Sequence, residues 1–356
     1  MDAAKFLEEK APLIDRAIEK YIPRKFTEDS VIFKIIPPMY SYNMQTLNKA
    51  IAEPIWEILD RGGKRWRPAL FLLICEKLGR ESDNYLDFAI IPEVVHNGTL
   101  IIDDLEDSSE LRRGKPCTYK LFGVDIAVNA GNAMYFLPLL PLMERKGELS
   151  PETLRDVYEA YVQEMINLSL GQAMDIAWHK GIANADVLEE NDYLQMCAYK
   201  TGTLARMSAK LAAVLSGANS NLVEKLGRFA ESIGVAFQMQ DDVLDLTGKE
   251  FSVKKGGVGQ DITEGKRTLM VIHTLKKADR ADRGRLIQIL KMHTSDQQLR
   301  DEAIAIMQKY KSIEYVKQTA AKMVEKTLGE AGKLLPTSQA KENLKAFAEF
   351  LIKRNI

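Results

Sequence analysis

Residues 96–114 read HNGTLIIDDLEDSSELRRG, in which three aspartates, a histidine and two arginines accompany an apolar helical run. A second stretch, residues 237–246, reads FQMQDDVLDL and repeats the spacing of the aspartates. Successive residues of a helix turn by about 100°, so aspartates at i, i+1 and i+4 share one face. The sequence therefore predicts two acidic helix faces. They consist of Asp103, Asp104 and Asp107 and of Asp241, Asp242 and Asp245.

Helical periodicity dominates the rest of the chain, and alternating strand patterns are almost absent. Ser150 before Pro151 is typical of a helix start, and Gly79 and Gly114 stand where helix ends are expected. Residues 24–43 are the least regular part and predict a connector. The predicted helices cover residues 3–20, 44–60, 67–79, 84–108, 125–144, 151–180, 190–217, 221–247, 266–277, 282–292, 296–309, 313–331 and 338–353. Because no repeat or linker divides the sequence, we expect one all-α domain over residues 1–356, with residues 1–43 as an N-terminal extension.

The composition favours a cytoplasmic protein without a nucleic-acid partner. Of the 356 residues, 46% are hydrophobic and 28% charged, and a net charge of −1 lacks the basic excess of nucleic-acid binders. The three cysteines are far apart and predict reduced thiols. The longest apolar run, residues 133–143, contains Pro138 and Pro141 and is too short to span a bilayer. The N-terminus lacks the basic start and apolar run of a signal peptide.

The repeated aspartate spacing points to a metal site. Carboxylates on one helix face repel each other, and a hard divalent cation such as Mg²⁺ relieves that repulsion while also binding substrate phosphate. A single acidic cluster is as a rule a solvated surface. Two clusters of equal spacing, each preceded by apolar residues, favour the metal interpretation. His96 and Gln238 share these faces, although either residue taken alone could be an ordinary buried hydrogen-bonding group.

Basic residues accompany the acidic clusters. GGKRWRP, residues 62–68, places Lys64, Arg65 and Arg67 at a helix start, where an anion would offset their unfavourable interaction with the helix dipole. Surface bases in a loop are the alternative. Arg112 and Arg113 follow the first acidic helix, where either the helix dipole or a phosphate could explain them. Lys200 in AYKTG and Lys266 in TEGKRTL are weaker candidates. Together the charges suit a highly anionic ligand.

In this order, GGKRWRP, EVVHNGTLIIDDLEDSSELRRG, YKTG, FQMQDDVLD and DITEGKRTL resemble the motifs of trans-isoprenyl diphosphate synthases. The segments IIDDLEDSSELRRGKP, NAMYF, GQAMDIAW and SIEYVKQTA are most similar to geranylgeranyl diphosphate synthases of the eukaryotic-like subgroup. The resemblance implies the isoprenoid synthase fold, one large bundle of antiparallel helices around a central cavity, in a homodimer. It also implies isopentenyl diphosphate and allylic prenyl diphosphates as substrates.

The resemblance implies a role for each matched residue. The six aspartates would hold three Mg²⁺ on the allylic diphosphate. That diphosphate would also be contacted by Arg112, Lys200, Thr201, Gln238 and Lys266, with Lys200 and Lys266 counted as catalytic. Isopentenyl diphosphate would be bound by Lys64, Arg67, His96 and Arg113, with Arg65 as a lesser candidate. The chain has Gly256 where relatives place a lysine, so Lys254 or Lys255 would substitute.

The implied reaction is ionisation of the allylic diphosphate and attack by the isopentenyl double bond, which needs no nucleophile or base triad. The product tail should run along the apolar face beneath Asp103. The residues expected to control its length are Gly98, Thr99, Val95, Tyr135, Phe136 and Ser169. Small Gly98 and Thr99 favour the twenty-carbon geranylgeranyl product, and twenty-five carbons or more is the alternative. A non-catalytic subunit or a terpene cyclase fits less well, because both usually lack one of the two aspartate motifs.

Overall fold

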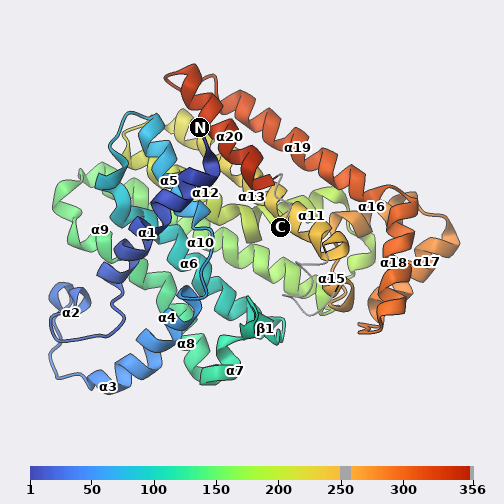
Figure 1. Ribbon diagram of the computed structural model, residues 1–356, viewed down its shortest axis with the longest axis horizontal. Coiled ribbons are helices and arrows are strands. Elements are labelled where there is room, and N and C mark those ends of the chain that lie inside the picture. The colour runs from blue at the N-terminus through green and yellow to red at the C-terminus, as the bar shows by residue number, and fades with distance from the viewer. Residues whose placement is uncertain (249–257, 353–356) are drawn as a thin grey trace. The chain divides into compact units, whose positions relative to one another are not determined.

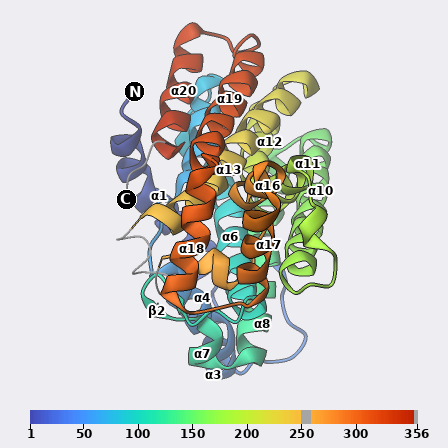
Figure 2. The same cartoon turned by 90° about the vertical axis from the view of Figure 1, so that its right-hand side faces the viewer.

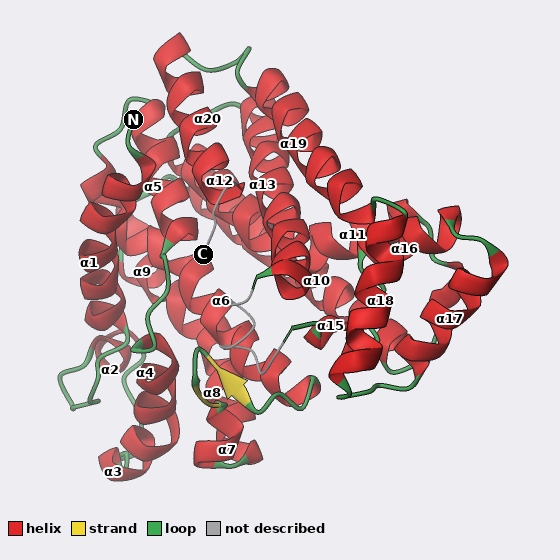
Figure 3. Cartoon of the chain, turned by 45° about the vertical axis from the view of Figure 1, so that its right-hand side comes forward, coloured by secondary structure: helices red, strands yellow, loops and turns green. Residues whose placement is uncertain are grey.

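The structure is a computed structural model that describes residues 1–248 and 258–352 (Figure 1). Helices make up most of these residues, which confirms the predicted all-α class. The strands within the described ranges are β1 (Leu111–Arg112) and β2 (Lys115–Pro116), which pair antiparallel in a short hairpin (Figure 3).

The chain divides into two compact units that alternate along the sequence. The first holds residues 1–163, 204–227 and 331–347, and the second holds residues 164–203, 228–330 and 348–356. A single domain over the whole chain stays a prediction.

Nine helices are labelled wholly within the first unit. They are α1 (Ala3–Tyr21), α2 (Val31–Ile35), α3 (Met44–Leu47), α4 (Glu53–Leu59), α5 (Trp66–Lys77), α6 (Leu86–Glu106), α7 (Thr118–Phe122), α8 (Val124–Phe136) and α9 (Leu140–Glu144). The second unit holds α11 (Glu190–Cys197), α15 (Gln260–Thr263), α16 (Leu269–Lys277), α17 (Arg280–Lys291) and α18 (Gln297–Lys309). Both units contain residues of α10 (Pro151–His179), α12 (Thr203–Leu215), α13 (Ser220–Thr247), α19 (Ser312–Ala331) and α20 (Ser338–Ile352). Within the second unit, α16, α17 and α18 pack on one another (Figures 1 and 2).

In the first unit, α6 and α8 approach closely because glycines meet at their crossing. A Cβ on Gly98 would lie 2.8 Å from the Cβ of Met134 and 2.9 Å from the carbonyl oxygen of Gly131. A Cβ on Gly131 would lie 2.8 Å from Cδ1 of Ile102. Neither position has room for a larger residue, so this contact fixes α6, the helix that carries the first acidic cluster.

The structure corrects the expectation for Gly114. Helix α6 ends at Glu106, and Gly114 lies in the hairpin turn with φ 77°. Arg113 precedes it with φ 52°, so both central residues of the turn have positive φ, the geometry that suits the twist of a tight hairpin. Arg112 and Arg113 are therefore hairpin residues. Arg112 nevertheless pairs with Asp103 and Asp104 near the C-terminus of α6, and the alternative that the helix dipole favours the two arginines stays a prediction.

Other differences have local causes. Pro138 and Pro141 divide the predicted helix 125–144 into α8, a 3-10 turn (Leu137–Leu139) and α9. A π-helical turn, Ala198–Gly202, separates α11 from α12. The predicted connector includes α2, where Phe33 packs with Phe26 and Ala52 in a small core. The N-cap prediction for Ser150 is confirmed, because its hydroxyl accepts the Thr153 N–H at 3.1 Å.

One stretch, residues 124–144, is long and apolar enough to cross a membrane by length and composition, with a hydropathy of 1.3. Its most apolar window is 44% buried, and a core helix of a soluble protein passes the same test. This is weak evidence for a membrane span.

Candidate active site

The first acidic cluster is held by the hairpin that follows it. Asp104 is fully buried, and its Oδ1 accepts hydrogen bonds from Nε of Arg112 at 2.7 Å and from Nη2 of the same side chain. Arg112 also lies 3.5 Å from Oδ2 of Asp103. Burial raises the pKa of Asp104 although Arg112 opposes that shift. The other oxygen of Asp104, Oδ2, is buried from solvent and has no hydrogen-bond partner in residues 1–248 and 258–352.

Arg61 holds this hairpin in place, and the sequence analysis missed it. Its side chain is 1% exposed and donates to the carbonyl oxygens of Arg112 at 2.9 Å and Pro116 at 2.6 Å. Its Nε and Nη2 donate to the carboxylate of Glu57, which lies one turn earlier on α4. Arg61 itself follows the C-terminal end of that helix. Because these donors go to protein acceptors, Arg61 positions the backbone that carries Arg112. The signal available in the sequence was the spacing, a glutamate followed four residues later by an arginine. The same spacing equally describes an exposed ion pair on a helix surface.

The loop before α5 brings two guanidinium groups against its backbone. Gly63 has φ 147°, and a Cβ there would lie 3.2 Å from Nη2 of Arg113 and 3.4 Å from Nη1 of Arg65. Arg113 also donates to the carbonyl oxygen of Gly62. The two glycines thus allow the hairpin arginine to lie across the loop. Lys64 is exposed beside them.

His96 lies among these bases. Burial lowers the pKa of His96 well below its usual range, and the positive charges of Arg67, Arg113, Arg112 and Arg65 lower it further. The imidazole is therefore neutral near pH 7, with the arginines supplying the positive charge. The structure thus brings together four bases and the histidine that the sequence analysis proposed for diphosphate binding.

Arg65 differs from its neighbours, because the protein already occupies its donors. Nε binds Oδ1 of Asp15 at 2.8 Å, Nη1 binds Oε1 of Glu93 at 2.9 Å, and Nη2 binds the carbonyl oxygen of Leu59 at 3.0 Å. With 4% of its side chain exposed, Arg65 supports the loop and does not reach a ligand. We therefore remove it from the candidate substrate contacts.

We expect the low pKa of His96 to make folding stability depend on pH. The unfolded chain binds a proton at about pH 6.5 and the folded chain only at lower pH, so the free energy of unfolding falls as pH drops below about 6.5. The slope from one such group is at most about 1.4 kcal/mol per pH unit. Urea unfolding between pH 7.5 and pH 5.5 should show less pH dependence for His96→Gln than for the parent chain.

His273 needs a parallel variant, because burial lowers its pKa as well. His273→Gln should remove a second part of the same pH dependence. An undiminished slope in His96→Gln would contradict a neutral, half-buried imidazole at position 96.

In the second unit, a chain of hydrogen bonds orients Asp242. Its Oδ1 accepts from Nε2 of Gln238 and its Oδ2 from the hydroxyl of Tyr193, both at 2.7 Å. Gln238 in turn accepts from Oγ1 of Thr201 at 3.1 Å. Asp245 is fully buried, and its Oδ2 accepts the Asp261 N–H at 3.1 Å. Tyr193 is the partner that the sequence analysis missed.

Lys200 lies in the π-helical turn and binds Oδ2 of Asp175 at 2.5 Å. A π-turn is frequent at functional sites because it redirects side chains within a helix. Gly171 permits the contact between α10 and this turn, because a Cβ there would lie 2.8 Å from Cα of Lys200 and closer still to its nitrogen. The motif GQAMD, residues 171–175, therefore supplies both the close approach and the carboxylate. Asp175 was also missed at the sequence level.

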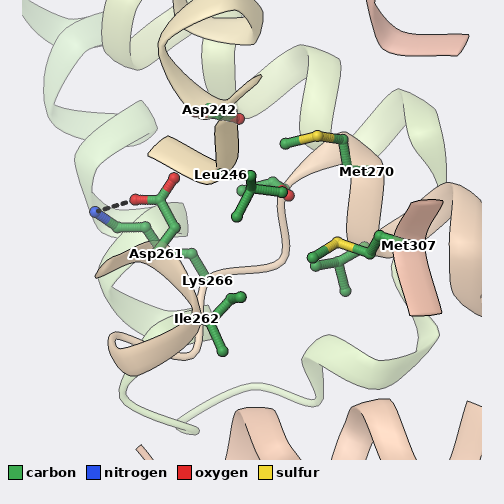
Figure 4. A pocket seen from close by; sticks show the side chains of 9 residues that line it. Asp242, Leu246, Asp261, Ile262, Lys266, Met270 and Met307 are labelled. Carbon is green, nitrogen blue, oxygen red and sulfur yellow. Dashed lines mark ion pairs between the residues drawn. The ribbon is translucent and has the colours of Figure 1, made fainter. Parts of the chain in front are cut away.

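A pocket in the second unit joins Asp242 to the Lys266 loop (Figure 4). Lys266 lies 4.0 Å from Oδ1 of Asp261 and 2.5 Å from Oε2 of Glu264. The remaining lining residues are Leu246, Ile262, Thr268, Met270, Val271 and Met307. Charged groups thus stand at a pocket with a largely apolar wall. Lys255, the other predicted loop base, lies outside the described residues.

The residues predicted to control product length differ in burial and in the groups they contact. Val95 is fully buried, and Thr99 is half-buried with its hydroxyl donating to the carbonyl oxygen of His96 at 2.7 Å. Gly98 faces α8 and serves the helix crossing. Tyr135 is half-buried near Asp103 and Glu106, whose charges, with burial, raise its pKa. Burial is the larger cause of that shift.

Two of these residues are exposed on this chain. Phe136 on α8 is 69% exposed. Ser169 is also exposed, with its hydroxyl donating to the carbonyl oxygen of Met165 at 3.0 Å. The role of either residue in length control stays a prediction.

The carboxylates of the two clusters are the candidate ligands for Mg²⁺. The described ranges hold no group of three or more histidine, cysteine or acidic side chains gathered as for a metal ion. Mg²⁺ is usually bound through one or two carboxylates, with water and substrate phosphate completing its shell. The carboxylate of buried Asp104 and the oriented carboxylate of Asp242 fit that mode of binding.

Comparison with known proteins shows the family of the chain. Residues 48–344 match the family model for polyprenyl synthetase. The chain is 34% identical over 297 residues to a short chain isoprenyl diphosphate synthase of Methanothermobacter thermautotrophicus, covering 83% of this chain and 88% of that protein. It is 30% identical to a geranylgeranyl diphosphate synthase of Saccharolobus solfataricus, covering 86% of this chain and 91% of that protein.

A solved structure agrees in fold. The geranylgeranyl pyrophosphate synthetase of Pyrococcus horikoshii has a TM-score of 0.84 and 31% identity, and the match covers 99% of this chain and 98% of that one. The chain belongs to the polyprenyl synthetase family and has the isoprenoid synthase fold. It is an enzyme of the trans-prenyltransferase class, as its motifs predicted. The eukaryotic-like subgroup stays a prediction.

Proposed function

We propose that this enzyme condenses isopentenyl diphosphate with allylic diphosphates in a Mg²⁺-dependent reaction and releases geranylgeranyl diphosphate. Two observations carry the proposal: protein contacts hold an acidic cluster in each unit, and in the first unit a basic cluster surrounds a neutral histidine. The named activities of the relatives support the same substrate class. The six aspartates of the two clusters would hold the metal, and the count of three ions rests on the motif resemblance.

Bound Mg²⁺ would neutralise charge on the diphosphate as it leaves. The chain's own residues supply the rest. Arg112, Lys200 and Lys266 would stabilise the leaving diphosphate, the form of electrostatic catalysis that charged groups fixed by protein contacts perform well. Asp175 and Arg61 hold two of these groups before substrate binds. Thr201 and Gln238 would orient the allylic substrate.

The second substrate would bind at the basic cluster of the first unit. Lys64, Arg67 and Arg113 would grip its diphosphate, since arginine forks match phosphate oxygens. His96 would contribute a neutral hydrogen bond. The proton lost after condensation would pass to the released diphosphate, which explains why the site uses no separate base.

The test is direct. Purified protein is incubated with Mg²⁺, labelled isopentenyl diphosphate and each allylic diphosphate in turn, and the products are separated by chain length. A twenty-carbon product supports the proposal. Products of twenty-five carbons or more would replace it with the longer-chain alternative, and no elongation would favour a non-catalytic subunit.

We also propose a cytoplasmic homodimer. On α7 and α8 of the first unit, Leu121, Val124 and Phe136 are 48%, 49% and 69% exposed. Exposed large apolar side chains suit contact with a second copy. Such contact would also account for the apolar character of residues 124–144. Sedimentation should give a mass near twice the 40.1 kDa of the chain.

Replacing Thr99 with phenylalanine should shorten the product. Thr99 lies one helical turn before Asp103, and the larger ring would block a tail running down α6. Product chain length, measured by reversed-phase chromatography, should fall to fifteen carbons or fewer. Thr99→Ser is the control and should keep the parent product. An unchanged product in Thr99→Phe would contradict this path for the tail.

A further inference from the structure

The N-terminal helix reaches the loop that precedes α5. Residues 1–47 lie outside the part of the chain that matches the family model. Helix α1 nevertheless packs against α5 and α6 of the first unit (Figure 1). Its buried side chains include Ile14, Ile18 and Tyr21. This packing places Asp15, on the same helix, where it accepts a hydrogen bond from Nε of Arg65 at 2.8 Å.

Arg65 has a backbone conformation that needs support. Its φ is 49°, a left-handed value that is uncommon for residues other than glycine. Such a conformation persists when surrounding contacts fix it. Asp15, Glu93 and the carbonyl oxygen of Leu59 provide these contacts from three separate elements.

The loop held by Arg65 carries the bases proposed for isopentenyl diphosphate. Lys64 precedes Arg65 directly, and Arg67 follows two residues later in the first turn of α5. Nη1 of Arg65 also lies against Gly63, next to the guanidinium of Arg113. A movement of Arg65 would therefore displace bases on both sides of the loop.

We propose that Asp15 is a positioning residue for isopentenyl diphosphate and acts through Arg65. The inference rests on the proposed function. Asp15 is half exposed and binds a guanidinium that is almost fully buried. Removing its charge takes away one of the two carboxylates that bind Arg65 within the described residues and leaves Glu93, so the loop loses part of its restraint. The N-terminal extension thereby tunes affinity for one of the two substrates.

The test compares Asp15→Asn with a matched change on the same helix. Glu9 is also exposed and pairs at 3.8 Å with Lys5 of the same helix, so this pair involves no residue of the loop. For Asp15→Asn we expect KM for isopentenyl diphosphate to rise about three- to tenfold, the scale of a partly exposed ion pair with a buried partner. The kcat and the KM for the allylic substrate should stay within about twofold. Glu9→Gln should change none of them, and Asp15→Glu should restore affinity.

The outcomes separate this inference from the proposed function. An equal rise in both KM values, or a lower kcat at unchanged KM, would show a general structural effect and overturn the role of Asp15. Unchanged kinetics in Asp15→Asn would overturn it as well. If the parent enzyme makes no prenyl product, the proposed function fails first. Calorimetric binding of isopentenyl diphosphate to the full chain then tests Asp15 without turnover.

Discussion

Replacing Asp104 with asparagine should lower the rate of chain elongation by about a thousandfold or more, the scale of losing a group that stabilises transition-state charge. Asp104 is fully buried, one of its oxygens holds Arg112, and the other has no hydrogen-bond partner in the described residues. The amide keeps the shape but removes the charge. Both Mg²⁺ binding and the placement of Arg112 should suffer. Incorporation of labelled isopentenyl diphosphate at saturating Mg²⁺ measures the loss.

Two further measurements make this result specific. Glu110→Gln alters a nearby carboxylate that is 77% exposed and pairs with Lys120, and it should leave the rate within about twofold. Urea unfolding of Asp104→Asn shows how much of its effect comes from instability, because breaking a buried ion pair costs about 3–5 kcal/mol. A folded Asp104→Asn protein with near-parent activity would refute the metal role of the first cluster.

Replacing Gly171 with alanine should lower kcat by about a hundredfold, a size expected when a catalytic group is misplaced by about 1 Å. The added Cβ would meet the backbone of Tyr199 and Lys200, which cannot rotate away as a side chain end could. The π-helical turn must then shift and carry Lys200 away from Asp175. Overpacking of this kind also destabilises a protein by about 1–3 kcal/mol. Steady-state kinetics and urea unfolding measure both effects.

Gly329→Ala is the matched control for this change. Gly329 also lies within a helix of the second unit, and a Cβ there would meet nothing within 4 Å. Its replacement should leave activity unchanged and raise stability by about 0.5–1 kcal/mol, because alanine favours helix. Parent-like kinetics in Gly171→Ala would show that the turn tolerates the displacement.

The helices and both aspartate clusters could be predicted because they depend on local patterns. Periodicity of 3.6 residues places the buried faces, and i, i+1 and i+4 spacing places the carboxylates, whatever the rest of the chain does. The hairpin at residues 111–116 escaped prediction for the same reason. Its turn uses Arg113 and Gly114 in place of the usual Asn-Gly, so no local signal marked positive φ at Arg113.

The partners of the site residues are long-range contacts, and these no pattern reveals. Asp175 and Tyr193 are ordinary helix residues until folding brings them to Lys200 and Asp242. Arg65 shows the reverse case, because its motif suggested a ligand contact while its environment gives it three protein acceptors. In the sequence, an acidic or basic residue looks the same whether it binds a ligand or supports another protein group. Only its neighbours in the folded chain decide which of these roles it has.

The sequence by itself determined the all-α class, the two acidic helix faces and the family, since each rests on residue spacing along the chain. The tertiary structure decided which charged groups are held by protein and which can reach a ligand. In the folded chain Arg61, Arg65 and Asp15 support other site residues. Arg112 and Arg113 lie on a hairpin, and Phe136 is exposed. The physical reason is that hydrogen-bond acceptors and buried surface come from elements far apart in sequence, and burial sets the strength of each charge interaction.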